Sequence, residues 1–176
     1  KKGEYQMVEE RYVHPELIPW DLDTFTGDAY PAYSWGVNVV EVEVDTLLAA
    51  AEIKGIWGVY DIGTVIDENI VRGQAEGGML QGIGYASIEK METGKSGRIL
   101  QPSLTDYIIP TAKDTTVFEI EFIDNPYADG PFGAKGLGEL TILGTAPAYA
   151  ASIEQAVNRA INRIPVTNEM LMDGFI

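Results

Sequence analysis

The chain has 176 residues, of which 45% are hydrophobic, and a formal net charge of −15 at pH 7. This length and apolar content allow one substantial core, the size of one domain or two small subdomains. The negative charge repels phosphate backbones and the 12 Lys and Arg residues form no basic cluster, which argues against a nucleic-acid partner. With no cysteine and one histidine, the chain by itself holds no disulfide, iron–sulfur cluster or Cys/His zinc site.

Hydropathy gives no membrane signal. No apolar run approaches the roughly 20 residues that span a bilayer, and the first residues contain no apolar signal core. We therefore expect no membrane partner, and the lack of cysteine fits a cytoplasmic protein. The abrupt start of the sequence is typical of a fragment or of a split subunit.

Residues 1–34 are rich in proline, aromatic residues and acids. Proline-containing dipeptides favour extended and turn conformations over helix. This segment predicts an extended arm that packs on the domain or on a partner, and residues 35–176 predict the domain itself.

Two segments of the predicted domain alternate in hydrophobicity. Residues 35–44 place valines at positions 40, 42 and 44 opposite glutamates at 41 and 43, and residues 117–123 alternate in the same way. A period of two is typical of half-buried strands. Residues 52–61 predict an antiparallel partner for the first strand, and residues 104–110 predict a short strand or extended segment.

Two further segments have helical spacing. Residues 141–161 predict a helix that breaks or restarts near Pro147. After a loop at residues 61–69, residues 73–86 also follow a helical period, with Gln74 at the start of the helix, although they include five glycines. Each glycine costs roughly 1 kcal/mol relative to alanine inside a helix, so either close packing on a sheet or the approach of a ligand must explain them. Together these elements predict mixed or antiparallel strands with packed helices.

The glycine-rich loop at residues 130–139 ends in Glu139. Glycines at this density favour positive φ or close backbone approach. Spacing alone leaves two interpretations open, a functional loop or a surface turn whose Glu139 only adds charge to the first turn of a helix. The loop lacks the GK[ST] ending of a phosphate loop and the third glycine of a dinucleotide fingerprint.

Taken in order, the segments 73–86, 104–112 and 133–139 resemble successive motifs of the molybdenum hydroxylases, the xanthine dehydrogenase and aldehyde oxidase family. The resemblance runs from about Tyr33 to about Asn162. It implies the C-terminal part of the large molybdopterin-binding subunit, with an α+β fold. It also implies that further cofactor contacts lie in the earlier half of that subunit.

The resemblance implies roles for particular residues. Glu139 falls on the catalytic base, which accepts a proton during the water-derived hydroxylation of an N-heterocycle, such as a purine, or of an aldehyde. Gln74 falls on the glutamine that hydrogen-bonds the pterin. No side chain of this chain is expected to bind the metal. The backbone expected beside the metal centre is that of Gly133, Ala134, Lys135 and Gly136.

The implied cofactor is molybdopterin carrying molybdenum, either as such or as a dinucleotide. Iron–sulfur clusters and flavin are expected only on other domains or subunits. The implied partners are therefore the remainder of the large subunit, the iron–sulfur and flavin subunits and a small-molecule substrate, and the isolated chain is expected to be inactive. The alternative is a structural or interaction domain that keeps the fold without a cofactor. The presence of both Gln74 and Glu139 favours the enzyme.

Overall fold

The computed structural model describes residues 6–13, 15–114 and 116–173. The chain divides into two compact units, Lys1–Tyr33 and Ser34–Ile176. Residues 1–5 and His14 of the predicted arm lie outside the described residues. The described part of the first unit contains no helix or regular strand. Its Asp21 carboxylate organises a turn by accepting hydrogen bonds from the backbone N–H groups of Asp23 and Thr24.

Strands β1 (Trp35–Asp45) and β2 (Ala50–Asp61) form the predicted antiparallel hairpin. The valines at positions 40, 42 and 44 of β1 are buried or half-buried and the glutamates at 41 and 43 are exposed, as their alternation predicted. A bulge opposite the step from Glu41 to Val42 inserts one extra residue into β2. Ile53 and Ile56, on either side of this bulge, therefore both pack into the core.

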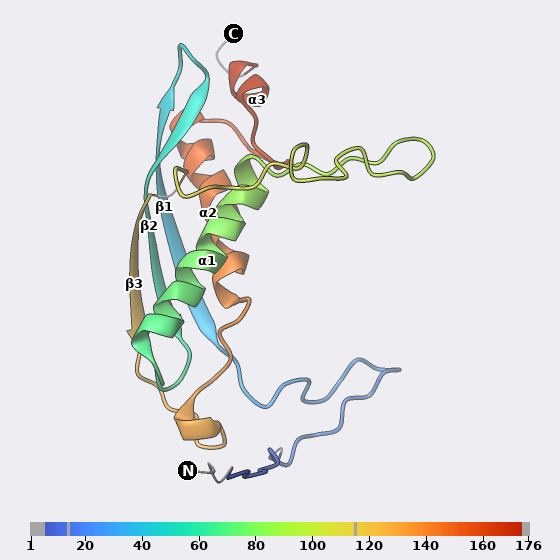
Figure 1. Ribbon diagram of the computed structural model, residues 1–176, viewed down its shortest axis with the longest axis vertical. Coiled ribbons are helices and arrows are strands. Elements are labelled where there is room, and N and C mark those ends of the chain that lie inside the picture. The colour runs from blue at the N-terminus through green and yellow to red at the C-terminus, as the bar shows by residue number, and fades with distance from the viewer. Residues whose placement is uncertain (1–5, 14, 115, 174–176) are drawn as a thin grey trace, which may run out of the picture. The chain divides into compact units, whose positions relative to one another are not determined.

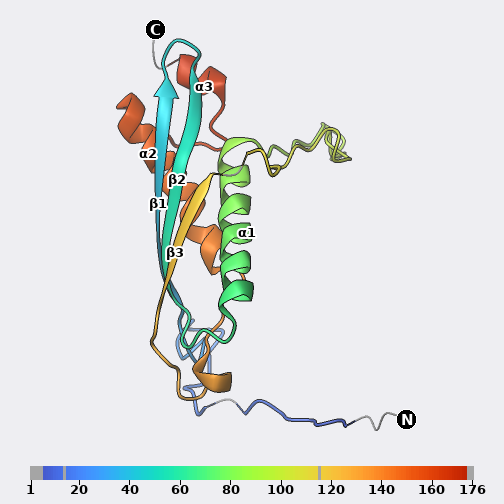
Figure 2. The same cartoon turned by 60° about the vertical axis from the view of Figure 1, so that its left-hand side comes forward.

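Strand β3 (Val117–Ile123) confirms the second predicted alternating segment and pairs in parallel with β2. The sheet order is β1-β2-β3, so β2 is central and the sheet is mixed. β3 pairs only with residues 55–61 of β2, and the end of the hairpin extends beyond it as two strands (Figure 2).

Helices α1 (Glu68–Ser87) and α2 (Leu140–Val157) lie on one face of the sheet and pack against each other (Figure 1). The 3₁₀ turn η1 (Pro131–Gly133) and the short helix α3 (Asn168–Met172) complete the α+β fold that the sequence predicted. Burial of a large apolar side chain contributes about 1.5–3 kcal/mol to folding. The largest fully buried side chains, contributed by the sheet and by both long helices, are those of Ile56, Tyr60, Met79 and Ile153.

The prediction that residues 67–69 belong to a loop and that the helix starts at Gln74 is wrong. Asp67 caps α1, because its carboxylate accepts hydrogen bonds from the backbone N–H groups of Asn69 (3.0 Å) and Ile70 (3.1 Å). The first turn is exposed, so no apolar period marked it in the sequence.

Pro147 lies inside α2 without ending it, contrary to the predicted break. The buried side chains of Ala146 and Tyr149 hold this part of the helix on the core, which offsets the hydrogen bond that proline cannot donate. The helix ends at Val157, and Asn158, with a φ of 50°, forms a left-handed cap.

Residues 104–110 form no strand. The backbone N–H of Tyr107 donates to the carbonyl of Ser103 in a turn, and an irregular segment follows. Among the helices of the described residues, none has the length and apolar character to cross a membrane.

Candidate functional site

A pocket of about 300 Å³ opens between the N-terminal half of α1 and the start of α2. The two segments that the sequence singled out, one around Gln74 and one ending in Glu139, meet in this pocket. Its lining residues are Gly73, Gln74, Gly77, Gly78, Gln81, Gly138, Glu139, Ile142 and Leu143.

Gln74 lies in the second turn of α1 and connects this helix to the glycine-rich loop. Its Nε2 donates a hydrogen bond to the carbonyl of Gly138 at 2.8 Å, directly before Glu139. A primary amide has a second N–H and an acceptor oxygen, and the side chain is exposed at the pocket. Gln74 therefore positions the loop and still presents hydrogen-bonding groups to a ligand.

Glu139 directly precedes α2 and is exposed. Its side chain does not cap the helix, and its carboxylate has no hydrogen-bond or ion-pair partner within the described part of the chain. A purely structural first-turn acid usually caps or pairs. The carboxylate is free to meet a ligand in the pocket.

Four glycines around the pocket are not required by the fold. A Cβ added at Gly73, Gly77, Gly136 or Gly138 would meet no atom of the described residues within 4 Å, apart from chain neighbours and the backbone of its own helix, and none of the four has positive φ. Each leaves an open approach to the backbone beside Gln74 or Glu139. These glycines leave room for a group that comes close to the backbone.

Two glycines on another face of α1 have the opposite environment. A Cβ at Gly78 would lie 2.0 Å from Thr141 Oγ1, and one at Gly82 would lie 2.9 Å from Thr145 Cβ. These glycines allow α1 and α2 to pack closely. Both explanations that the sequence left open for the glycine-rich helix therefore apply, on different faces.

Side-chain and backbone contacts fix the loop at residues 133–136 onto the end of β2. Lys135 Nζ lies 2.8 Å from Asp61 Oδ2, and both side chains are only 9% exposed. The Lys135 ammonium holds the pKa of the Asp61 carboxyl below its ordinary value of 3.8, against the opposing effect of burial. The carbonyl of Gly133 accepts from Thr64 N–H, and Lys135 N–H donates to the carbonyl of Ile62.

These contacts limit what the predicted loop residues offer a ligand. The backbone N–H groups of Gly133, Ala134 and Lys135 all donate to carbonyls within the fold. Gly133 has a φ of 83°, which glycine adopts without strain. These three residues hold the loop in place. At Gly136 an added Cβ would meet no described atom within 4 Å, although the carbonyl of Gly136 accepts a hydrogen bond from Ser34 Oγ.

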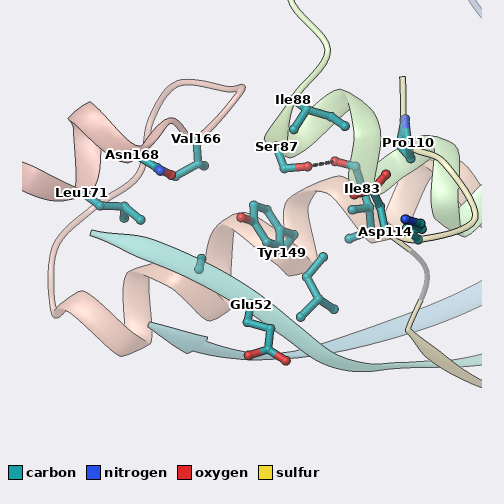
Figure 3. Close-up of a pocket in the computed structure, with 13 residues that line it drawn as sticks. Glu52, Ile83, Ser87, Ile88, Pro110, Asp114, Tyr149, Val166, Asn168 and Leu171 are labelled. Atoms are coloured by element: carbon teal, nitrogen blue, oxygen red, sulfur yellow. Dashed lines mark hydrogen bonds between the residues drawn. The ribbon is translucent and has the colours of Figure 1, made fainter. Parts of the chain in front are cut away.

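A second pocket, of about 360 Å³, lies at the C-terminal end of α1 and includes neither Gln74 nor Glu139. Figure 3 shows Tyr149 of α2 in this pocket between Glu52 of β2 and Ser87 of α1. Burial raises the pKa of the Tyr149 hydroxyl, which keeps it protonated. The Asp114 carboxylate accepts hydrogen bonds from Thr111. Glu52 is paired with Lys54 at 3.1 Å, so neither carboxylate of this pocket is unpartnered as Glu139 is.

Sequence reasoning named Gln74 and Glu139 but missed several residues that line their pocket. Gly77 and Gln81 follow Gln74 at helical intervals of three and seven residues, so this spacing could have identified them. Leu143 follows Glu139 by one helical turn in the same way. The pairing of Lys135 with Asp61 had no signal in the sequence, because the two residues are 74 positions apart.

Comparison with known proteins gives a consistent result. A sequence model described as "Molybdopterin cofactor-binding domain" matches residues 2–116. A putative xanthine dehydrogenase molybdenum-binding subunit of Escherichia coli (strain K12) is 34% identical over 170 residues, which cover 94% of this chain and 22% of that protein. The 6-hydroxypseudooxynicotine dehydrogenase complex subunit gamma of Paenarthrobacter nicotinovorans is 34% identical, over 79% of this chain and 18% of that protein.

Among solved structures, the aldehyde oxidoreductase from Desulfovibrio gigas aligns with a TM-score of 0.79 and 27% sequence identity. The alignment covers 90% of this chain and 17% of that chain. The chain therefore spans about a fifth of the length of these relatives.

Proposed function

This chain belongs to the molybdopterin cofactor-binding domain family, and we propose that it is the part of a molybdenum hydroxylase large subunit that contacts the pterin through Gln74 and supplies Glu139 as catalytic base. The reaction is the hydroxylation of an N-heterocycle, such as a purine, or of an aldehyde, with oxygen derived from water. The names of the relatives, a xanthine dehydrogenase subunit and an aldehyde oxidoreductase, support both substrate classes.

One observation carries this proposal. Gln74 and Glu139 are 65 positions apart in the sequence, yet they line one pocket, where Gln74 holds the carbonyl of the residue before Glu139. The open glycines around the pocket have no role in internal packing. A glycine that neither packs nor needs positive φ is explained by a group that approaches the backbone closely.

The residues present fit a pterin cofactor. The exposed amide of Gln74 offers a donor and an acceptor, which matches the edge of a pterin ring. Gly73 and Gly77 leave the adjacent surface of α1 without side chains, so a flat group has room there. We assign Gln74 and these glycines to cofactor contact, together with Gly136. Gly133, Ala134 and Lys135 support the contact by holding the loop.

When bound, the cofactor would supply the redox chemistry, which no residue of this chain provides. A carboxylate oxygen of Glu139 accepts the proton that is released as oxygen is inserted into the substrate. General bases typically contribute 10²–10⁴ in rate. No described residue competes for this carboxylate, which keeps it available for the proton.

The rest of the enzyme lies outside this chain. The chain has no cysteine to bind an iron–sulfur cluster, so we place the clusters and flavin on other domains or subunits. One relative is named as the subunit of a complex, which supports this arrangement. The remainder of the large subunit completes the cofactor contacts.

The test is made on the chain assembled with the remainder of its large subunit and with its iron–sulfur and flavin partners. Glu139→Gln keeps the shape of the side chain but accepts no proton, so turnover should fall at least 100-fold while molybdenum content stays near wild type. Glu169→Gln, which neutralises an exposed carboxylate of α3 outside the pocket, is the matched control and should retain activity. Purine, other N-heterocycle and aldehyde substrates are assayed in parallel.

Gln74→Leu should instead lower the bound molybdenum and pterin, since it removes both the cofactor contact and the bond to Gly138. Normal turnover in Glu139→Gln would refute the role of Glu139. An assembled subunit that retains no molybdenum would favour the structural or interaction domain.

A further inference from the structure

The face of the sheet that points away from α1 and α2 is unusually apolar. Figure 1 shows both long helices on the other side of the strands. We define the outer patch as the side chains of Trp35, Val37, Val39, Trp57 and Val59. Trp35 is 69% exposed, Val37 65% and Val39 55%.

The outer patch is continuous across two strands. In the register of the sheet, Val39 lies opposite Trp57 and Val37 lies opposite Val59. Side chains at directly opposed positions are in contact range on the same face. A solvated face of a sheet normally carries polar side chains at these positions. Exposed contiguous apolar patches of this kind mark interaction surfaces.

Acidic side chains border the outer patch on two sides. Glu41 and Glu43 of β1 lie on the same face of the sheet as the patch, as do Glu119 and Glu121 of β3. All four side chains are exposed. Lys54 of β2 is paired with Glu43 at 3.0 Å. The surface thus has an apolar centre with a negative rim. The complementary surface has an apolar centre with a basic rim.

This charge pattern selects among the possible occupants. A second copy of the chain carries the same acidic rim and a net charge of −15, so two outer patches facing each other would repel. Acidic residues also outnumber basic ones in residues 1–33, so the charge of this segment does not complement an acidic rim. The relatives are about five times longer than this chain, so most of the large subunit remains as a source of a complementary segment.

We propose that the outer patch is the docking surface for the remainder of the large subunit, which contacts it through an apolar segment bordered by Lys or Arg side chains. The proposal rests on the proposed function, in which this chain is one part of such a subunit. It assigns the cofactor side and the docking side of the domain to different surfaces, the pocket between α1 and α2 and the opposite face of the sheet.

The test measures binding between the full 176-residue chain and a separately produced polypeptide that carries the remainder of the large subunit. Val37→Glu and Val59→Glu should each weaken binding, raising the dissociation constant at least tenfold. Leu47→Glu adds the same charge at the β1–β2 turn, where Leu47 is 95% exposed, and should bind like wild type. Binding should also protect Trp35 from acrylamide quenching.

Charge reversal tests the acidic rim. Glu41→Lys and Glu121→Lys should weaken binding, and the loss should be smaller at high salt. Circular dichroism confirms that each variant is folded. Val37→Thr, which keeps the branched shape and removes an apolar contact without adding charge, replaces Val37→Glu if that variant fails to fold, and should also bind more weakly than wild type.

Wild-type affinity of the folded Val37→Glu and Val59→Glu variants would overturn the proposal. So would a dimer of the chain alone that Val37→Glu dissociates, because the occupant would then be a second copy. The binding measurement needs no molybdenum, and Glu139→Gln should bind normally. A complex that depends on the outer patch but retains no molybdenum would refute the proposed function and leave the docking surface standing.

Discussion

Gly77 and Gly82 of α1 provide a matched test of the two faces of the helix. The same substitution, glycine to alanine, meets open space at Gly77 and the helix α2 at Gly82. Gly77→Ala should stabilise the chain and impair cofactor binding. Gly82→Ala should destabilise the chain.

The magnitudes follow from the surroundings of each Cβ. In a helix, alanine is about 1 kcal/mol more favourable than glycine, and nothing opposes this gain at Gly77. At Gly82 the new Cβ would lie 2.9 Å from Thr145 Cβ and 3.1 Å from the carbonyl oxygen of Ile142. Because a backbone atom cannot rotate away, overpacking should cost about 1–3 kcal/mol. After the helix gain is subtracted, Gly82→Ala should be about 1 kcal/mol less stable than wild type.

Urea unfolding of the chain measures both free energies, and a thermal melt should show Gly77→Ala higher by about 2–4 °C. Molybdenum content of the assembled subunit then separates the two effects, since Gly77→Ala should lose metal despite its greater stability. A destabilised Gly77→Ala, or a Gly82→Ala as stable as Gly77→Ala, would show that the two faces are wrongly assigned.

Two further predictions concern buried polar groups. Lys135→Met leaves Asp61 buried without its cation and should lower the free energy of unfolding by about 3 kcal/mol at pH 7, whereas Lys54→Met, at an exposed pair, should change the urea midpoint little. Because the pKa of Asp61 is lowered in the fold, the pair stabilises the folded chain above pH 3.8, and this stability is lost as the pH falls below that value. A difference in unfolding free energy between Lys135→Met and wild type that persisted at pH 2 would exclude the pair as its cause. Burial raises the pKa of Tyr60 to about 12, so its contribution to stability should be present below pH 10 and lost as the pH rises through 12. Ultraviolet titration should show a late component, to which Tyr149 also contributes, and Tyr60→Phe should reduce its amplitude; an unchanged amplitude would contradict the assignment.

Local patterns predicted much of the fold. The alternation at residues 35–44 and 117–123 identified β1 and β3, because a strand turns alternate side chains to opposite faces whatever its partners. The start of α1 was missed, since its first turn is exposed and its cap depends on one aspartate. Pro147 predicted a break that the packing of α2 against the core prevents.

The sequence by itself determined which residues of the candidate site are chemically able to act, an amide at Gln74 and a carboxylate at Glu139 with glycines beside each. Helical periodicity also places Gly77 and Gly78 about 100° apart on α1. Only the tertiary structure decided that Gly78 faces α2 while Gly77 faces the pocket, and that Lys135 is bound to Asp61. Both outcomes depend on contacts between segments far apart in the chain, which local spacing does not encode.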